Sequence, residues 1–274
     1  MTFLVDVAVV CPLPTNEHPG FMPRIPPAML DLNADLAEHD DPAHDAALLP
    51  YLTSCNVAAG FHAGGPWVLE RTVRAALDHG VTIGAHPAYD DRAHFGRRSL
   101  DVPRAQLLAQ LRYQIAAVRG VVASLGGRLH HVKAHGALYN DMNRDADLAR
   151  AVMGLVREMD PALKIYALAH SHVVTIGAEM GVTVVAEGFA DRQYAAVDAL
   201  RSRKLDGAVL TDPEAVLAQV AGFLDGTVVL HDGTRRPIAL QTLCLHGDTP
   251  DALRLSREIY RFLTARGVRL GRNV

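Results

Sequence analysis

The sequence predicts an α/β protein whose residues 29–274 form a single seven-stranded (β/α) barrel domain. Short apolar runs alternate with amphipathic helical patterns without an intervening linker, and this alternation favours parallel strands joined by right-handed crossovers. Nearly every apolar run also ends in a polar, chemically capable residue, and in a parallel barrel those ends share one face. An open doubly wound sheet is the alternative, but it concentrates its chemistry at one switch point.

The predicted strands are seven apolar, partly β-branched runs. In chain order they cover residues 29–36, 52–59, 81–87, 129–136, 164–170, 182–188 and 240–247. Helical patterns are expected at residues 66–77, 103–125, 145–159, 171–180, 213–224 and 250–265. Several begin at a proline, and Asp212 stands directly before Pro213 as a capping side chain, which is typical of a helix N-terminus.

Composition narrows the function classes. A chain of 274 residues with 49% hydrophobic content can bury a large core without disulfides, and a net charge of −3 disfavours nucleic acid and anionic membranes as partners. Small molecules and other proteins, including a second copy of the chain, are the expected partners. No apolar run reaches the roughly 20 residues of a membrane span. The cysteines Cys11, Cys55 and Cys244 show no CxxC spacing, which predicts free thiols in the cytoplasm.

Residues 1–28 are rich in proline and lack periodicity. We expect them to be a poorly structured N-terminal extension, or the product of an over-long start with Met22 or Met29 as the true first residue. They do not look like a signal peptide, because Asp6 interrupts the apolar run and no basic residue precedes it.

A first group of candidate site residues is acidic. Asp31, Asn33 and Asp35 alternate with apolar residues and so share one face of a strand. On an outer strand that face would be solvated, whereas inside a barrel it forms a polar pocket wall, which is the interpretation we prefer. With Glu38 just beyond, two carboxylates could divide the roles of base and acid.

A second group is basic. His62, His86, His135 and His246 follow predicted strands, and Lys133 alternates with His135. Imidazole and carboxylate would suit Zn²⁺, Mn²⁺ or Fe²⁺, but there is no HExxH pair, so the use of a divalent metal stays open. Lys133 could be the counter-ion of a carboxylate or could bind phosphate or a substrate carboxylate. Neither a P-loop nor a GxGxxG motif is present.

Six ordered blocks of the sequence closely resemble the LamB/YcsF family. They are DLNADLAE, NVAAGFHAGGP, GAHPAYDD with HFGRR, VKAHGALYN, FADRQY and CLHGD. The resemblance implies a seven-stranded barrel related to the glycoside hydrolase/deacetylase-like fold. It also implies the ATP-dependent hydrolytic opening of 5-oxo-L-proline, a lactam, to L-glutamate, with ATP used by a complex that contains partner B and C subunits of a 5-oxoprolinase.

The resemblance also suggests roles. Asp35 or Glu38 would be the general base, and His86 and His135 would donate protons or stabilise an oxyanion. Lys133 and Arg97 would bind phosphate or the substrate carboxylate. The residues expected to contact or orient substrate are Asp31, Asn33, Asn56, His62, Arg97, Tyr139, Glu187, Asp191, Arg192 and His246.

The sequence departs from the family pattern at several positions. Ala34 and Ala59 stand where cysteine is usual, Gly65 where aspartate is usual, Ala37 where glycine is usual and Ala134 where proline is usual. Because of these departures, a related lactam or amide is an alternative substrate. Two other functions also stay open: a metal-dependent amidase or deacetylase that uses the same barrel without ATP, and a non-catalytic ligand-binding subunit.

Overall fold

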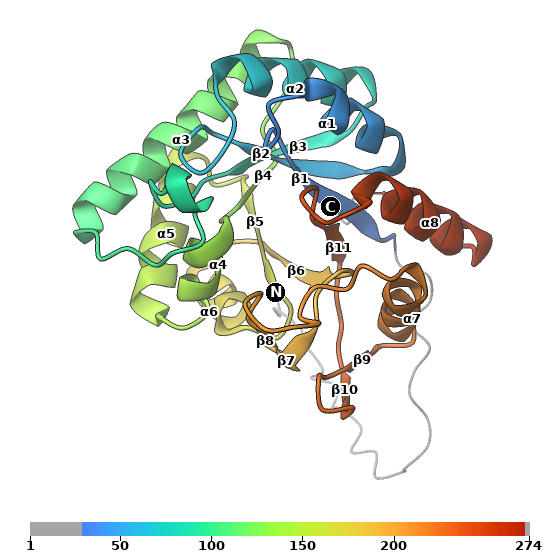
Figure 1. The fold of residues 1–274 in the computed structure, drawn as a ribbon. Coiled ribbons are helices and arrows are strands. Elements are labelled where there is room, and N and C mark those ends of the chain that lie inside the picture. The colour runs from blue at the N-terminus through green and yellow to red at the C-terminus, as the bar shows by residue number, and fades with distance from the viewer. Residues whose placement is uncertain (1–28, 272–274) are drawn as a thin grey trace, which may run out of the picture.

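The computed structural model describes residues 29–271, so the predicted extension at residues 1–28 lies outside the described residues. Seven parallel strands close into a barrel, and helices surround them (Figure 1). The order around the barrel is β1-β11-β6-β5-β4-β3-β2. The strands are β1 (Asp31–Leu36), β2 (Ser54–Ala58), β3 (Thr82–His86), β4 (His131–Lys133), β5 (Lys164–Leu168), β6 (Val184–Phe189) and β11 (Thr242–Leu245). The predicted seven-stranded barrel is confirmed.

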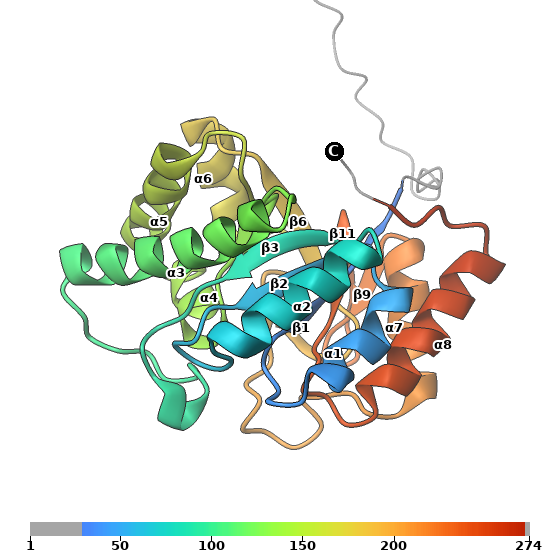
Figure 2. The same ribbon diagram turned by 90° about the horizontal axis from the view of Figure 1, so that it is seen from above.

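All six predicted helices are present within a few residues of their expected bounds. They are α2 (Pro66–Asp78), α3 (Arg104–Ser124), α5 (Ala146–Met159), α6 (His172–Met180), α7 (Pro213–Leu224) and α8 (Ala252–Ala265). They lie outside the barrel, with α8 beside both α7 and the short helix α1 (Pro42–Leu48) (Figure 2). Asp212 caps α7 by accepting a hydrogen bond from the backbone N–H of Ala215, as its place before Pro213 predicts. No helix of the described chain is long and apolar enough to cross a bilayer.

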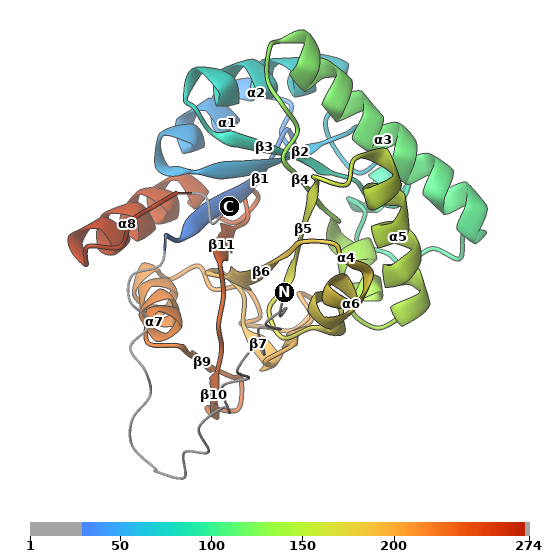
Figure 3. The same ribbon diagram turned by 180° about the vertical axis from the view of Figure 1, so that it is seen from behind.

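Several short elements were not predicted. They are α1 (Pro42–Leu48), α4 (Gly136–Met142), the 3₁₀ turns η1 (Leu49–Tyr51) and η2 (Arg92–His94), and the paired strands β7 (Tyr194–Ala196) with β8 (Ala199–Leu200) and β9 (Thr227–Val229) with β10 (Arg235–Pro237). Each is at most two helical turns or three strand residues long, too short for a periodic signal. Figure 3 shows β7 and the β9–β10 pair on the same side of the barrel as α7.

An apolar layer lies between the strands and the helices. On α3, Leu107, Leu111, Ile115, Val118 and Val122 are all buried and form one stripe toward the sheet. The strands contribute their outward-facing apolar residues to the same core. The buried thiols of Cys55 and Cys244 are both free, as expected, whereas Cys11 lies outside the described residues.

The inside of the barrel is polar instead. At the end where the strands begin, the buried Asp31 carboxylate accepts hydrogen bonds from the hydroxyl groups of Thr53 (2.6 Å), Ser54 (2.7 Å), Tyr166 (3.0 Å) and Thr242 (2.6 Å). A buried carboxylate is tolerated only when its oxygens are satisfied in this way. Asp31 was expected to contact substrate, but it lies far down the barrel and ties β1 to β2, β5 and β11.

The packing of this polar interior yields a stability prediction. A Cβ atom added at Gly84 would fall on the His131 imidazole inside the barrel, whereas one added at Gly120, on the exposed side of α3, would meet no atom within 4 Å. Gly84→Ala should therefore lower the free energy of unfolding by roughly 1–3 kcal/mol. Gly120→Ala should raise it by roughly 0.4–1 kcal/mol. Urea titration of both variants provides the measurement, and an unchanged midpoint for Gly84→Ala would contradict the packing described.

Candidate active site

A pocket of about 270 Å³ opens where the strands end. In a parallel barrel these ends, and the loops after them, form the face that carries chemistry. Eight predicted site residues line the pocket: Asp35, His86, Arg97, Lys133, His135, Tyr139, Arg192 and His246. They come from strands, loops and helix α4, which are far apart in the sequence, so the fold brings these eight residues together at one place.

The Lys133 ammonium group stands at the centre of the pocket floor. Its Nζ lies 2.9 Å from Asp35 Oδ1, 3.0 Å from Glu187 Oε1 and 3.1 Å from Cys244 Sγ. Burial alone would lower the pKa of Lys133, but the charges of Asp35, Cys244 and Glu187 outweigh it and raise that pKa well above its ordinary value. An ammonium group has three N–H donors, and all three are used here. The structure thus favours Lys133 as a counter-ion over Lys133 as a direct substrate ligand.

Amide and hydroxyl groups hold the two carboxylates in place. Asn56 Nδ2 donates to Asp35 Oδ1 and to Asn33 Oδ1, both at 2.8 Å. Asn33 Nδ2 in turn donates to Glu187 Oε1 at 3.1 Å, and the Tyr139 hydroxyl donates to Glu187 Oε2 at 2.9 Å. Asn33, Asn56 and Glu187 therefore orient the pocket floor from below, while Tyr139 also reaches the pocket wall.

Behind the floor, three imidazoles surround the Glu38 carboxylate. Glu38 Oε1 lies 3.0 Å from His62 Nε2, 3.2 Å from His135 Nδ1 and 3.8 Å from His86 Nε2. His86 Nε2 is also 3.0 Å from His135 Nδ1 and 3.3 Å from Asp35 Oδ2. The side chains of Glu38 and His62 are only 3% and 0% exposed, and neither residue lines the pocket itself.

Two backbone carbonyls orient the imidazoles. His86 Nδ1 donates to the carbonyl oxygen of Lys133 at 2.8 Å, and His135 Nε2 donates to that of Phe95 at 2.9 Å. A carbonyl oxygen can only accept, so these contacts place a proton on the far nitrogen of each ring. Burial and the neighbouring His135 lower the pKa of His62 to about 3, so this ring is neutral.

A second histidine, His246, borders the pocket on the other side. Its Nδ1 lies 2.9 Å from Asp191 Oδ1, and the ring stacks on Phe189 with 5.2 Å between the ring centroids. The hydroxyl of Thr249 also donates to Asp191. A carboxylate that accepts the Nδ1–H of an imidazole fixes its tautomer and leaves Nε2 for the pocket. Asp191 thus positions His246.

The mouth of the pocket is strongly cationic. Arg97 and Arg203 share the Asp248 carboxylate, whereas no carboxylate of residues 29–271 lies within ion-pair distance of Arg192. The buried Arg192 guanidinium donates instead to the backbone carbonyl of Arg201 at 2.6 Å. Burial and the neighbouring Arg203 lower the pKa of Arg192 to about 10, so it remains charged at neutral pH. Arg192 is consequently a buried cation that forms no direct ion pair within residues 29–271.

Sequence reasoning missed other residues at this mouth. Arg144, Arg201, Ser202 and Lys204 line it together with Phe189 and Leu200. The run of basic residues at 201–204 was visible in the sequence, but only the β7–β8 turn brings that run over the pocket. Phe189 gave no signal, because an aromatic residue at a strand end is more often part of the core.

The structure shows where four of the departures from the family pattern lie. Ala34 alternates with Asn33 and Asp35 and is buried on the outer face of β1, so a cysteine there would not reach the pocket. Ala37 has φ 61°, a left-handed conformation that costs a non-glycine residue roughly 1–2 kcal/mol. Ala134 borders the pocket. Gly65 caps α2 with an extended backbone, and no side-chain oxygen closes that helix end.

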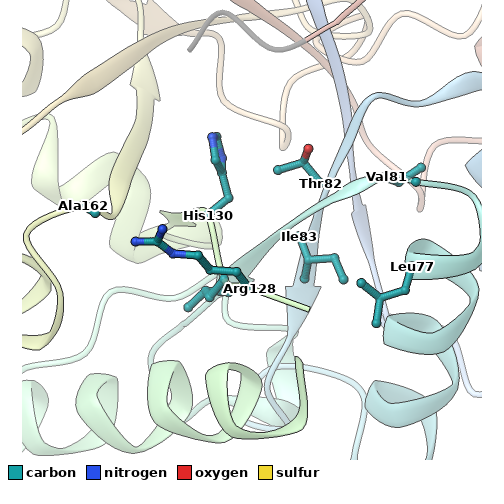
Figure 4. Close-up of a pocket in the computed structure, with 9 residues that line it drawn as sticks. Leu77, Val81, Thr82, Ile83, Arg128, His130 and Ala162 are labelled. Carbon is teal, nitrogen blue, oxygen red and sulfur yellow. The ribbon is translucent and has the colours of Figure 1, made fainter. Parts of the chain in front are cut away.

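A larger cavity of about 460 Å³ lies at the opposite end of the barrel, where β3 and β4 begin (Figure 4). Leu77, Val81 and Ile83 line one side, and Arg128 and His130 line the other. No cluster of carboxylates and imidazoles within residues 29–271 faces it. Within the described residues, the clusters of carboxylate and imidazole groups thus lie at or behind the smaller pocket.

Comparison with known proteins identifies the family of the chain. The profile of the LamB/YcsF family matches residues 30–273. The chain belongs to the LamB/YcsF family. It is 44% identical to the A subunit of the 5-oxoprolinase of Bordetella parapertussis over 87% of this chain and 96% of that protein. It is also 44% identical to the corresponding 5-oxoprolinase subunit of Streptomyces coelicolor over 89% of this chain and 99% of that protein.

A solved structure shows the same family fold. The crystal structure of the lactam utilization protein from Thermus thermophilus is 35% identical in sequence and superposes with a TM-score of 0.82. The match covers 89% of this chain and 99% of that protein. The LamB/YcsF barrel is thus shared over nearly the whole described chain.

The Asp191–His246 pair yields a pH prediction. Burial would raise the pKa of Asp191, but His246 and Thr249 outweigh it and lower that pKa from 3.8 to about 2. A lowered folded-state pKa adds stability that is present above about pH 4 and is lost as the pH falls through about 2. We expect Asp191→Asn to be less stable than the wild type by about 2 kcal/mol at pH 6.

That difference should shrink as the pH approaches 2, as measured by urea unfolding at each pH. Asp90→Asn, on the exposed surface, is the control for removal of a carboxylate. A stability difference between Asp191→Asn and the wild type that stays constant from pH 6 to pH 2 would contradict the assignment.

Proposed function

We propose that this chain is the A subunit of a 5-oxoprolinase and that its pocket opens 5-oxo-L-proline to L-glutamate. The observation that carries the proposal is the meeting of Asp35, Lys133, His86 and His135 at one pocket in a chain 44% identical to 5-oxoprolinase A subunits. The blocks of sequence that support the family assignment are the same ones that supply these side chains.

The substrate is a small ring with one carboxylate and one lactam group. A pocket of about 270 Å³ has room for a molecule of this size. The charge of Arg192 at the mouth suits the carboxylate, because a guanidinium group binds a carboxylate through two parallel hydrogen bonds. With the carboxylate at Arg192, the lactam group reaches toward the floor formed by Asp35, His86 and His135.

Hydrolysis of the ring moves one proton and breaks one bond. The oxygen of a water molecule bonds to the lactam carbonyl carbon, the C–N bond of the ring breaks, and the nitrogen gains the proton that the water loses. Asp35 Oδ2 faces the imidazoles and is free of the Lys133 contact, which Oδ1 makes, so we assign it the contact with the attacking water. His246, fixed by Asp191, borders the same pocket and is placed to protonate the nitrogen.

The proposal includes the complex. The relatives are described as single subunits of a 5-oxoprolinase, which implies that they act with other subunits, and we extend this to B and C partners of the present chain. Opening an unstrained lactam is unfavourable, and ATP hydrolysis supplies the free energy. The chain carries no P-loop, so we assign the use of ATP to the complex as a whole. We place this complex in the cytoplasm, where ATP is available.

Glutamate release from 5-oxo-L-proline tests the proposal. The purified chain is combined with its B and C partners, with and without ATP, and glutamate should form only in the complete mixture with ATP. Asp35→Asn should reduce the rate by roughly 10²–10⁴, the range typical of a lost acid–base group. His79→Gln, at the exposed position directly after α2, is the matched control. Glutamate formation at the wild-type rate by a folded Asp35→Asn variant would refute the assigned site.

The role of Arg192 predicts an effect on substrate binding. Arg192→Gln removes one charge-assisted contact with the substrate carboxylate, which is worth roughly 1.5–3 kcal/mol. We therefore expect the KM for 5-oxo-L-proline to rise roughly 10- to 100-fold while kcat changes less. Arg150→Gln, an exposed arginine paired with Glu179 on the outer helices, is the control. An unchanged KM for Arg192→Gln would place the substrate carboxylate elsewhere.

A further inference from the structure

We propose that Glu38, His86 and His135 bind one divalent transition-metal ion, such as Zn²⁺, at the back of the pocket. The proposed function gives this ion its chemical role, but the site itself is argued from geometry alone. Glu38 follows β1, His86 ends β3 and His135 follows β4, so strands on both sides of β2 bring the ligands together.

The distances between the three ligand atoms suit a metal ion. His135 Nδ1 lies 3.0 Å from His86 Nε2 and 3.2 Å from Glu38 Oε1, and the third separation, between His86 Nε2 and Glu38 Oε1, is 3.8 Å. Tetrahedral ligands placed roughly 2.0–2.1 Å from Zn²⁺ lie about 3.3 Å from one another. The observed triangle brackets that value.

The hydrogen bonds on the far sides of the rings strengthen the assignment. The carbonyl groups of Lys133 and Phe95 fix the protons of His86 and His135 on the nitrogens that face away from the cluster. Neutral rings in these tautomers point two nitrogen lone pairs at each other and at the Glu38 carboxylate. Such carbonyl contacts are the usual outer support of histidines that bind metal.

A proton on one of the imidazoles would satisfy these facing ligand atoms less well than a metal ion. A proton on His86 Nε2 faces His135 Nδ1, Asp35 Oδ2 and Glu38 Oε1, but one N–H can be directed well at only one of them. A single cation between Glu38, His86 and His135 satisfies all three ligand atoms together. Buried acceptors without a donor are costly, so the arrangement favours the cation.

His62 is not a ligand of the proposed ion. Its ring stacks on that of His135, with 3.8 Å between centroids and 6° between planes. An ion bound by an imidazole lies near the plane of the ring, and two stacked planes do not meet at one ion. His62 instead donates its Nε2–H to Glu38 at 3.0 Å and so holds the carboxylate ligand in place.

The other cluster of ligand-type residues does not compete. Asp35, Cys244 and His246 lie within 4.8 Å of one another, but the Lys133 ammonium already occupies the space between Asp35 and Cys244. No lysine or arginine of residues 29–271 forms an ion pair with Glu38, whose close side-chain partners are the three histidines. One glutamate and two histidines form the ligand set of several catalytic zinc sites, which leave one position open for water. Because His86 and His135 line the pocket and Glu38 does not, that open position faces the substrate.

Metal binding by the purified full-length chain tests this inference without any assay of activity. The chain is stripped with a chelator, dialysed and titrated with Co²⁺, whose visible absorption reports its ligands, and with Zn²⁺ by calorimetry. We expect one ion per chain and a higher unfolding midpoint with Zn²⁺. Glu38→Gln and His135→Gln should lose the Co²⁺ spectrum and bind Zn²⁺ at least roughly 100-fold more weakly.

His62→Gln should weaken Zn²⁺ binding roughly 10- to 100-fold, as expected for a residue that holds a ligand. His79→Gln should bind like the wild type. The thermal unfolding of each metal-free variant shows that it is folded. A folded wild-type chain that binds neither ion, or equal Zn²⁺ affinity in Glu38→Gln and the wild type, would overturn the site. Stoichiometric binding without glutamate release by the complex would instead leave the site standing and count against the proposed function.

Discussion

The buried charge of Lys133 is the interaction on which the rest of the site depends. An ammonium group inside a barrel is tolerated only with close partners, and Asp35 and Glu187 provide them from strands β1 and β6. Each carboxylate in turn needs its own donors, which Asn33, Asn56 and Tyr139 supply. Removing the ammonium would leave two buried carboxylates facing each other without a counter-ion. The ammonium charge and the hydrogen-bond network around it therefore depend on each other.

This polar interior divides the barrel into two ends. Four hydroxyl groups gather around Asp31 inside the barrel where the strands begin, and they satisfy its carboxylate with contacts from the protein itself. At the other end the network stops at Asp35 and Lys133, and the pocket begins. The same strands therefore carry a structural hydrogen-bond cluster around Asp31 at one end and the candidate site around Asp35 and Lys133 at the other. The apolar layer outside the barrel supplies most of the hydrophobic burial, which frees the inner face for polar groups.

Much of the fold and site could be predicted from the sequence, because strand alternation and polar strand ends are local signals. Alternation correctly placed Asp31, Asn33 and Asp35 on the inner face, but it carries no information on depth, so Asp31 was expected near substrate. The three-donor saturation of Lys133 and the stacking of His62 on His135 depend on contacts between strands that no local pattern encodes. The cationic mouth at residues 201–204 depends on a turn of only a few residues.

A crystal structure of the chain with bound 5-oxo-L-proline is the most direct test of the central claim, that the floor fixed by Lys133 is where the lactam reacts. We predict that the ring lies in the pocket, with its carboxylate at Arg192 and its carbonyl group toward His86 and His135, while Lys133 keeps its contacts with Asp35 and Glu187. A ligand bound in the cavity beside Arg128, or a lactam group turned away from Asp35 and the histidines, would contradict it.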